Sequence, residues 1–214
     1  MVRQVCQRCG SFSTDGPVRS DGPGWAVVTC PACAHYTRIR RLPLFVLTGA
    51  SGTGKTSISE LLLYTFPDVV VLESDVLLAA LRSFADEDIQ HYWNLWLGLV
   101  LHVHQAGKPV LLCGTVQPRH LETAPDRDGI EAIHYVALTC DDAELQRRLR
   151  DRPAWRRCDD AFIASQVSFN RWWRDREWQA DVQVEGDLLD TTTATPRQTA
   201  ETVRAWVRER LPRR

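Results

Sequence analysis

Residues 44–56 read Leu-Phe-Val-Leu-Thr-Gly-Ala-Ser-Gly-Thr-Gly-Lys-Thr, and this stretch decides the fold. It begins with a continuous apolar run, which is typical of a buried parallel strand. After the glycine-rich loop, Ile58, Leu61 and Leu62 recur at helical spacing within an expected helix at residues 55–66. The order of strand, loop and amphipathic helix places the loop at the carboxyl end of a buried strand.

The loop has the pattern G-x-x-x-x-G-K-[ST] of a P-loop. Its glycines let the backbone turn so that successive N–H groups point inward at phosphate oxygens. The positive end of the following helix dipole adds to this attraction. Lys55 is expected to reach the β- and γ-phosphates of ATP, and the Thr56 hydroxyl is expected to ligate Mg²⁺. The expected nucleotide-binding residues are Gly49, Ser51, Gly52, Thr53, Gly54, Lys55 and Thr56.

After Pro43, apolar runs of strand length alternate with stretches of helical length. Strands are expected at residues 69–72, 109–113, 133–139 and 182–189, and helices at about 86–105, after Asp141 or Asp142, at 159–178 and from Thr195. This alternation predicts an α/β fold, with a five-stranded parallel sheet flanked by helices, in a domain spanning residues 42–214. The GTPase base-recognition motif N-K-x-D is absent from the sequence, and 214 residues are few for a motor or an AAA+ ATPase.

Two further patterns accompany the P-loop. The second expected strand runs into the carboxylates of Glu73 and Asp75, and ligands bind at the carboxyl ends of strands in open parallel sheets. Six arginines lie between Arg147 and Arg157, after the fourth expected strand. Together with the P-loop, these features make the chain resemble the small P-loop kinase family over about residues 44–210. That family contains shikimate, gluconate, nucleoside and nucleotide kinases and chloramphenicol phosphotransferase.

The resemblance implies an ATP-dependent phosphotransferase that moves the γ-phosphate onto a hydroxyl of a small molecule, most simply a nucleoside, a nucleotide or a related natural product. In this family an aspartate after the second strand takes the proton of the acceptor hydroxyl, and Asp75 has that position. Arginines of a lid, here at about residues 147–158, close over ATP and neutralise the transferring phosphoryl group. Arg148 and Arg152 are expected to do so, and with Lys55 and Asp75 they are the expected catalytic residues.

Several of these positions have a second interpretation. Ser74 or Asp75 would also serve as a helix N-cap, and Glu73 is an alternative base or a Mg²⁺ ligand acting through water. Arg119 either binds an anionic group of the acceptor or is simply exposed. The aromatic residues of the 86–105 helix either wall an acceptor pocket or belong to the core. These residues are Tyr92, Trp93 and Trp96.

Four of the seven cysteines lie in the first 41 residues as two C-x-x-C pairs. The pair Cys6 and Cys9 is separated by twenty residues from the pair Cys30 and Cys33, which is the upper limit of a zinc-site spacing. Each pair places two sulfurs on a tight turn, and two such turns make a tetrahedral site suited to structural Zn²⁺. Residues 1–41 are therefore expected to form a zinc ribbon, with a redox pair or an iron–sulfur cluster as the alternatives.

Charge and hydropathy limit the expected partners. The chain has a net charge of −1 and no apolar run near the roughly 20 residues of a membrane helix, so a cytoplasmic protein without membrane contact is expected. Residues 1–41 carry six arginines against two aspartates, a net charge of +4. A small-molecule acceptor is the first expectation for the partner, and nucleic acid is the second, as in a polynucleotide 5′-kinase. A non-catalytic nucleotide-sensing module is the third hypothesis, and a ribbon that covers the acceptor pocket or mediates self-association is also compatible with the sequence.

Overall fold

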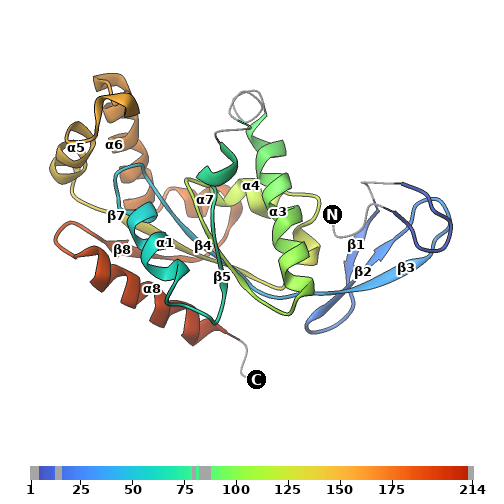
Figure 1. The fold of residues 1–214 in the computed structure, drawn as a ribbon. Coiled ribbons are helices and arrows are strands. Elements are labelled where there is room, and N and C mark those ends of the chain that lie inside the picture. The colour runs from blue at the N-terminus through green and yellow to red at the C-terminus, as the bar shows by residue number, and fades with distance from the viewer. Residues whose placement is uncertain (1–4, 13–15, 79–80, 82–87, 212–214) are drawn as a thin grey trace.

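The central element is a five-stranded parallel sheet in the strand order β5-β6-β4-β7-β8 (Figure 1). The computed structural model of the chain describes residues 5–12, 16–78, 81 and 88–211. The strands are β4 (Leu44–Gly49), β5 (Val70–Glu73), β6 (Val110–Cys113), β7 (Ile133–Thr139) and β8 (Gly186–Asp190). The predicted α/β fold with a five-stranded parallel sheet is therefore confirmed.

Helices cover both faces of this sheet, and the alternation of side chains along β4 explains the two layers. Phe45 and Leu47 belong to a core with residues of α1 (Lys55–Leu63) and α8 (Pro196–Arg210). Leu44 and Val46 belong to a second core with residues of α3 (Ile89–Gln105). Further helices are α4 (Pro118–Glu122), α5 (Asp142–Arg150), α6 (Asp160–Arg174) and α7 (Trp178–Val182). Within the described ranges, no helix combines the length and apolarity that crossing a bilayer requires.

Three elements differ from the sequence-based expectation by more than one residue at a described end. Helix α1 ends at Leu63, four residues before Pro67, instead of at residue 66. The single helix expected at residues 159–178 is interrupted after Arg174, where Arg176 adopts a left-handed φ of 60°, and α7 is separate. Strand β8 begins at Gly186, because residues 178–182 are helical. The expected helix start at Asp86 and the outer ends of both expected domains, residues 1–4 and 212–214, lie outside the described residues.

A second, antiparallel sheet precedes the parallel one. It has the order β1-β2-β3 and contains β1 (Val18–Ser20), β2 (Trp25–Thr29) and β3 (Tyr36–Arg40). We call residues 5–41, which comprise this sheet and the turns of the four N-terminal cysteines, the ribbon. Its inner face contributes Val18, Ala26, Val28 and Ile39 to the same core as Leu97 and Leu101 of α3.

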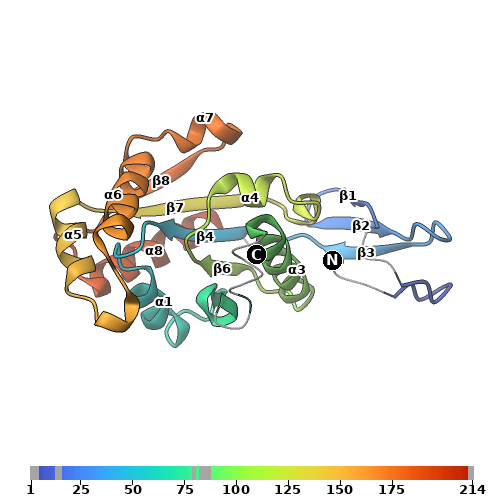
Figure 2. The same ribbon diagram turned by 90° about the horizontal axis from the view of Figure 1, so that it is seen from above.

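Only residues 41–43 separate β3 from β4, so the ribbon lies at the amino end of the central strand. Arg41 donates hydrogen bonds to the Ile130 carbonyl and the Ser20 hydroxyl, and Gln105 of α3 exchanges two hydrogen bonds with the Arg40 backbone. The glycine-rich loop follows the opposite, carboxyl end of β4, about 20 Å away for a strand of six residues. Figures 1 and 2 both show β1–β3 at one end of the molecule and α5 and α6 at the other.

Candidate active site and metal cluster

The P-loop follows β4 directly, and its glycines are required by its geometry. Gly49 has a φ of 132°, and a Cβ at this position would collide with the Leu138 carbonyl oxygen on β7. Gly52 has a φ of 95° and lies where a Cβ would meet the side chains of Leu145 and Leu149 on α5. L-amino acids with side chains rarely adopt such φ values. The glycines thus allow the loop to turn sharply and to pack closely beneath α5.

Lys55 is buried at the start of α1. Its Nζ donates hydrogen bonds to the carbonyl oxygens of Gly49 (2.8 Å) and Ala50 (2.9 Å), so the ammonium is held against the loop. Burial lowers the pKa of Lys55 to about 8, although the nearby carboxylates of Glu73 and Asp75 favour its charged form. A cation held at this place is suited to phosphate oxygens.

A cavity of about 520 Å³ surrounds the P-loop. Its walls include every expected nucleotide-binding residue except Gly49, which is buried and shapes the turn. The expected catalytic residues Lys55, Asp75, Arg148 and Arg152 also line it. The lining includes residues that follow β4, β5 and β6, and β6 is the strand that separates β4 from β5. β6 is followed by Gly114, where a Cβ would collide with the Ser74 hydroxyl and approach Trp93.

The arginines in α5 and directly after it have different partners. Arg152 donates to the Ser51 hydroxyl of the P-loop at 2.9 Å. Arg148 donates to Glu144 (2.7 Å) and to the Thr191 carbonyl (2.6 Å), which connects α5 to the residues after β8. Arg147 also lines the cavity but is largely exposed, and it pairs with Glu144 of α5 and with Asp151 directly after the helix. Among the described arginines of residues 147–157, Arg152 is therefore the one that donates a hydrogen bond to the P-loop.

The two carboxylates after β5 have different environments. The Glu73 side chain is half-buried and accepts a hydrogen bond from the Ser59 hydroxyl at 2.7 Å. Burial raises the pKa of Glu73, and the neighbouring Asp75 raises it further. Glu73 lines only the cavity around the P-loop, whereas the exposed Asp75 also lines a second cavity beside it.

The second cavity has a volume of about 750 Å³ and a markedly aromatic wall. Tyr92 and Trp93 of α3 lie on one side, with Trp155 and Phe162 also in the lining. The two cavities share five residues: Ser51, Asp75, Thr115, Arg152 and Arg156. The core interpretation of the aromatic helix is therefore confirmed for all three residues, and two of them also line a cavity. Tyr92 and Trp93 are buried in the core and also wall the cavity, whereas Trp96 belongs only to the core.

Comparison with known proteins finds similar structures but no similar sequence family. No protein-family model and no curated protein matches the chain. Among solved structures, a sugar kinase from Janibacter sp. HTCC2649 is 16% identical with a TM-score of 0.57, covering 78% of this chain and 95% of its own. A gluconokinase from Sinorhizobium meliloti 1021 is 18% identical (TM-score 0.53), covering 80% of this chain and 95% of its own. The APS kinase CysC of Mycobacterium tuberculosis, in complex with AMPPNP and APS, is 18% identical (TM-score 0.53), covering 78% and 99%.

The chain has the P-loop kinase fold. The identities are too low to show more than the fold.

Several residues that line or support this site are not evident from the sequence. The Thr191 hydroxyl donates to the carbonyl oxygens of Thr53 and Thr139, and Gln166 of α6 accepts a hydrogen bond from the Ser51 backbone N–H at 2.8 Å. Trp155 is 72% exposed and lies in a 3₁₀ turn, Ala154–Arg156. The signal available for Thr191 is its place directly after the last strand of the sheet. Arg119 is exposed and lines neither cavity.

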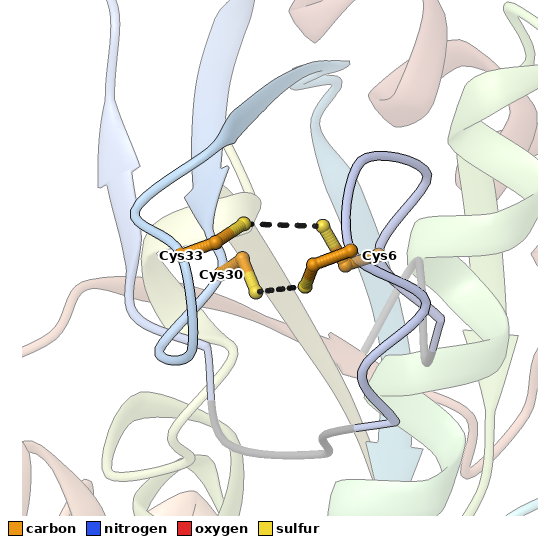
Figure 3. A group of neighbouring side chains, drawn as sticks. Cys6, Cys30 and Cys33 are labelled. Carbon is orange, nitrogen blue, oxygen red and sulfur yellow. Dashed lines mark hydrogen bonds between the residues drawn. The ribbon is translucent and has the colours of Figure 1, made fainter.

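Outside the P-loop kinase sheet, the four ribbon cysteines form one cluster (Figure 3). The Sγ atoms of Cys6 and Cys33 are 3.7 Å apart, those of Cys9 and Cys30 are 3.8 Å apart, and all four lie within 4.8 Å of one another. A tetrahedral zinc with Zn–S bonds of about 2.3 Å separates its sulfurs by about 3.8 Å. The donor set and its spacing therefore fit Zn²⁺.

The two cysteine turns repeat one hydrogen-bond pattern. In the first, the Cys6 N–H donates to the Ser11 carbonyl and the Gly10 N–H donates back to the Cys6 carbonyl. In the second, Cys30 bonds in the same way with His35 and Ala34. The residue four positions after the first cysteine is left-handed in both turns, with φ values of 71° at Gly10 and 56° at Ala34. The pattern fixes both sulfurs of each turn toward the shared centre.

Proposed function

We propose that the chain is an ATP-dependent kinase that transfers the γ-phosphate onto a hydroxyl of a small molecule, namely a nucleoside, a nucleotide or a related natural product. The observation that carries the proposal is the junction of the two cavities at Asp75 and Arg152. A triphosphate on the P-loop and an acceptor in the aromatic cavity would meet at these side chains. The P-loop kinase fold supports the same conclusion.

The transfer uses groups that line this junction. The acceptor oxygen forms a bond to the γ-phosphorus while its proton passes to the Asp75 carboxylate. The bond from the γ-phosphorus to the bridging β–γ oxygen breaks, and its electron pair leaves with ADP. Lys55 and Arg152 neutralise the charge on the phosphates. The Thr56 hydroxyl and, through water, the Glu73 carboxylate are oxygen donors in the same cavity that suit Mg²⁺, which adds positive charge when bound.

The shape and chemistry of the second cavity support a ring-bearing acceptor. Its volume of about 750 Å³ lies within the range of about 300–1,000 Å³ for small-molecule sites. Aromatic planes such as those of Trp93 and Trp155 stack on bases and pack on sugars. Asp75 is the acidic side chain in the described lining of this cavity, so an acceptor hydroxyl placed there has one carboxylate to meet.

The test is turnover of ATP with a panel of nucleosides and nucleotides, comparing Asp75→Asn with Glu73→Gln. Asp75→Asn should lower kcat by about 10²–10⁴-fold, because it removes the base, while ATP affinity stays within about threefold. Glu73→Gln should mainly raise the KM for ATP. Full turnover by Asp75→Asn would show that Asp75 is not the base. Nucleotide binding without phosphorylation of any acceptor would instead favour a nucleotide-sensing module.

We also propose that the cysteine cluster holds a structural Zn²⁺. Four cysteine ligands, Cys6, Cys9, Cys30 and Cys33, would leave the ion no open position for substrate or water. The ion would connect the two cysteine turns of the ribbon, which are otherwise short and largely exposed. This role is distinct from that of Mg²⁺, which would act at the P-loop.

A further inference from the structure

We propose that the outer face of the ribbon sheet binds single-stranded nucleic acid. Residues that pair across neighbouring strands lie on the same face of a sheet, so the strand register defines this face. Val27 pairs with Arg19 on β1 and with Arg38 on β3. On the same face, Trp25 pairs with Arg40, and Thr29 pairs with Tyr36. The opposite set, which includes Ala26 and Ile39, is buried in the core. We call the outward set the ribbon face; its chemically distinctive members are Arg19, Trp25, Tyr36, Arg38 and Arg40.

The charge of the ribbon face complements a phosphate backbone. Arg19 lies on β1, and Arg38 and Arg40 lie on β3, so positive charges occupy both edges of the sheet. Arg38 forms an exposed ion pair with Asp21 at 2.8 Å, whereas Arg19 and Arg40 form no ion pair with any residue that the structure describes. Residues 1–41 carry a net +4 in a chain of net −1. The positive charge is therefore concentrated at this end of the molecule.

Planar groups accompany these charges. The guanidinium groups of Arg38 and Arg40 lie over the Trp25 ring, with their central carbons 4.5 and 5.4 Å from its centroid. The Tyr36 ring is 67% exposed and stacks with His35 at 6.3 Å between centroids. Unpaired bases stack on aromatic rings and on guanidinium planes, whereas bases in a duplex are already stacked. Exposed planes beside arginines therefore favour a single strand over a duplex.

The position of the ribbon face separates this inference from the proposed kinase reaction. The ribbon lies at the amino end of β4 (Figure 2), and no described residue of the ribbon lines either cavity, so the ribbon does not cover the proposed acceptor pocket. From Tyr36 to Arg40 the face extends about 13 Å along the strand, and three strands span about 10 Å. Sheets in RNA-recognition modules stack about two or three bases in this way. A strand bound here would leave the ATP cavity accessible.

Fluorescence anisotropy of the full-length, zinc-loaded protein with a labelled single strand of about 12 uridines tests the proposal. Binding should weaken as salt increases, and Arg19→Ala and Arg40→Ala should each lower affinity about three- to tenfold and reduce the salt slope by about 0.7. Tyr36→Ala should lower affinity at least about fivefold with an unchanged salt slope, and Tyr36→Phe should retain it. Arg208→Ala, which alters an exposed arginine on α8, is the matched control and should bind normally.

Zinc content and thermal midpoint are measured for each variant, so that lost binding is compared only among folded proteins. A duplex of the same length should bind more weakly than the single strand. The proposal is overturned if the ribbon variants bind like Arg208→Ala, or if duplex and single strand bind equally. It is also overturned if MgATP displaces the strand, which would place binding at the kinase cavity, or if polyglutamate competes as well as an unlabelled strand, which would indicate an acidic protein partner.

Discussion

The two sheets of this chain are stabilised in different ways. Strands β4 and β6 of the parallel sheet are fully buried, and their apolar side chains form one core on each face. The ribbon sheet is buried on one face only, and its cysteine turns lie beyond that core. A short segment with half a core needs another source of stability, and a metal ion is a common one. One chain thus combines a sheet with a core on each face and a sheet with half a core beside four cysteines whose spacing fits a metal ion.

The largest expected effect is that loss of the metal destabilises the ribbon and leaves the parallel sheet and its ATP affinity almost unchanged. Cys30→Ser removes one of four ligands, and metal binding of this kind contributes about 10–16 kcal/mol in zinc-finger peptides. We expect loss of bound zinc and of amide-exchange protection in residues 16–41, while ATP affinity changes by no more than about twofold. Cys158→Ser alters a thiol outside the cluster and should keep its zinc. Loss of ATP binding in Cys30→Ser would mean that the two regions are not separable.

A substitution in the shared core should affect both regions together. Ile39 is 2% exposed and belongs to the same core as α3 and β4. Ile39→Ala should lower the free energy of unfolding by about 2–5 kcal/mol in urea denaturation with zinc present, because it leaves a cavity there. Arg19→Ala, on the exposed face of the same sheet, should change it by no more than about 0.5 kcal/mol. Equal effects of the two substitutions would contradict the shared core.

The smallest expected effect concerns only the P-loop. The pKa of Lys55 is lowered to about 8 by burial, so the side chain loses its charge as pH rises through 8. Phosphates favour charged Lys55, so affinity for ATP should begin to fall near pH 8 and should fall by up to about tenfold per pH unit above it. Calorimetry between pH 7.5 and about 9.5 measures this. Lys55→Arg stays charged, so its weaker binding should not depend on pH in this range. An unchanged affinity of the natural protein would contradict the lowered pKa.

The sequence indicates most of the elements but not their neighbours. Strands buried on both faces must be apolar, so β4, β6 and β7 can be recognised from short apolar runs. These runs do not reveal the order of the strands in the sheet. The order places β6 between β4, which precedes the P-loop, and β5, which precedes Asp75. The ends of α1 and α6 were wrong by a few residues, because local turns after Leu63 and Arg174 have no strong signal.

The site likewise contains residues that the sequence identifies and residues that only the tertiary structure brings together. The P-loop and the cysteine pairs are contiguous motifs, and their chemistry can be inferred from spacing alone. Trp155 and Gln166 reach the site because α5 and α6 pack against the P-loop, so no local pattern identifies them. The docking of the ribbon through Ile39 depends on the register of β3 with β2. Tertiary placement, and not residue type, decides these contacts.

The alternation along β4 has a consequence for how energetic effects travel through the molecule. Val46 faces the core that includes the ribbon, and Leu47, the next residue, faces the core that includes α8. These two adjacent residues thus belong to different hydrophobic cores. Val46 and Ile39, seven positions apart in the sequence, belong to the same core. Substitutions in contact tend to interact, and distant ones tend to add. In this chain, distance along the sequence is a poor measure of energetic coupling, and the face of the central strand is a better one.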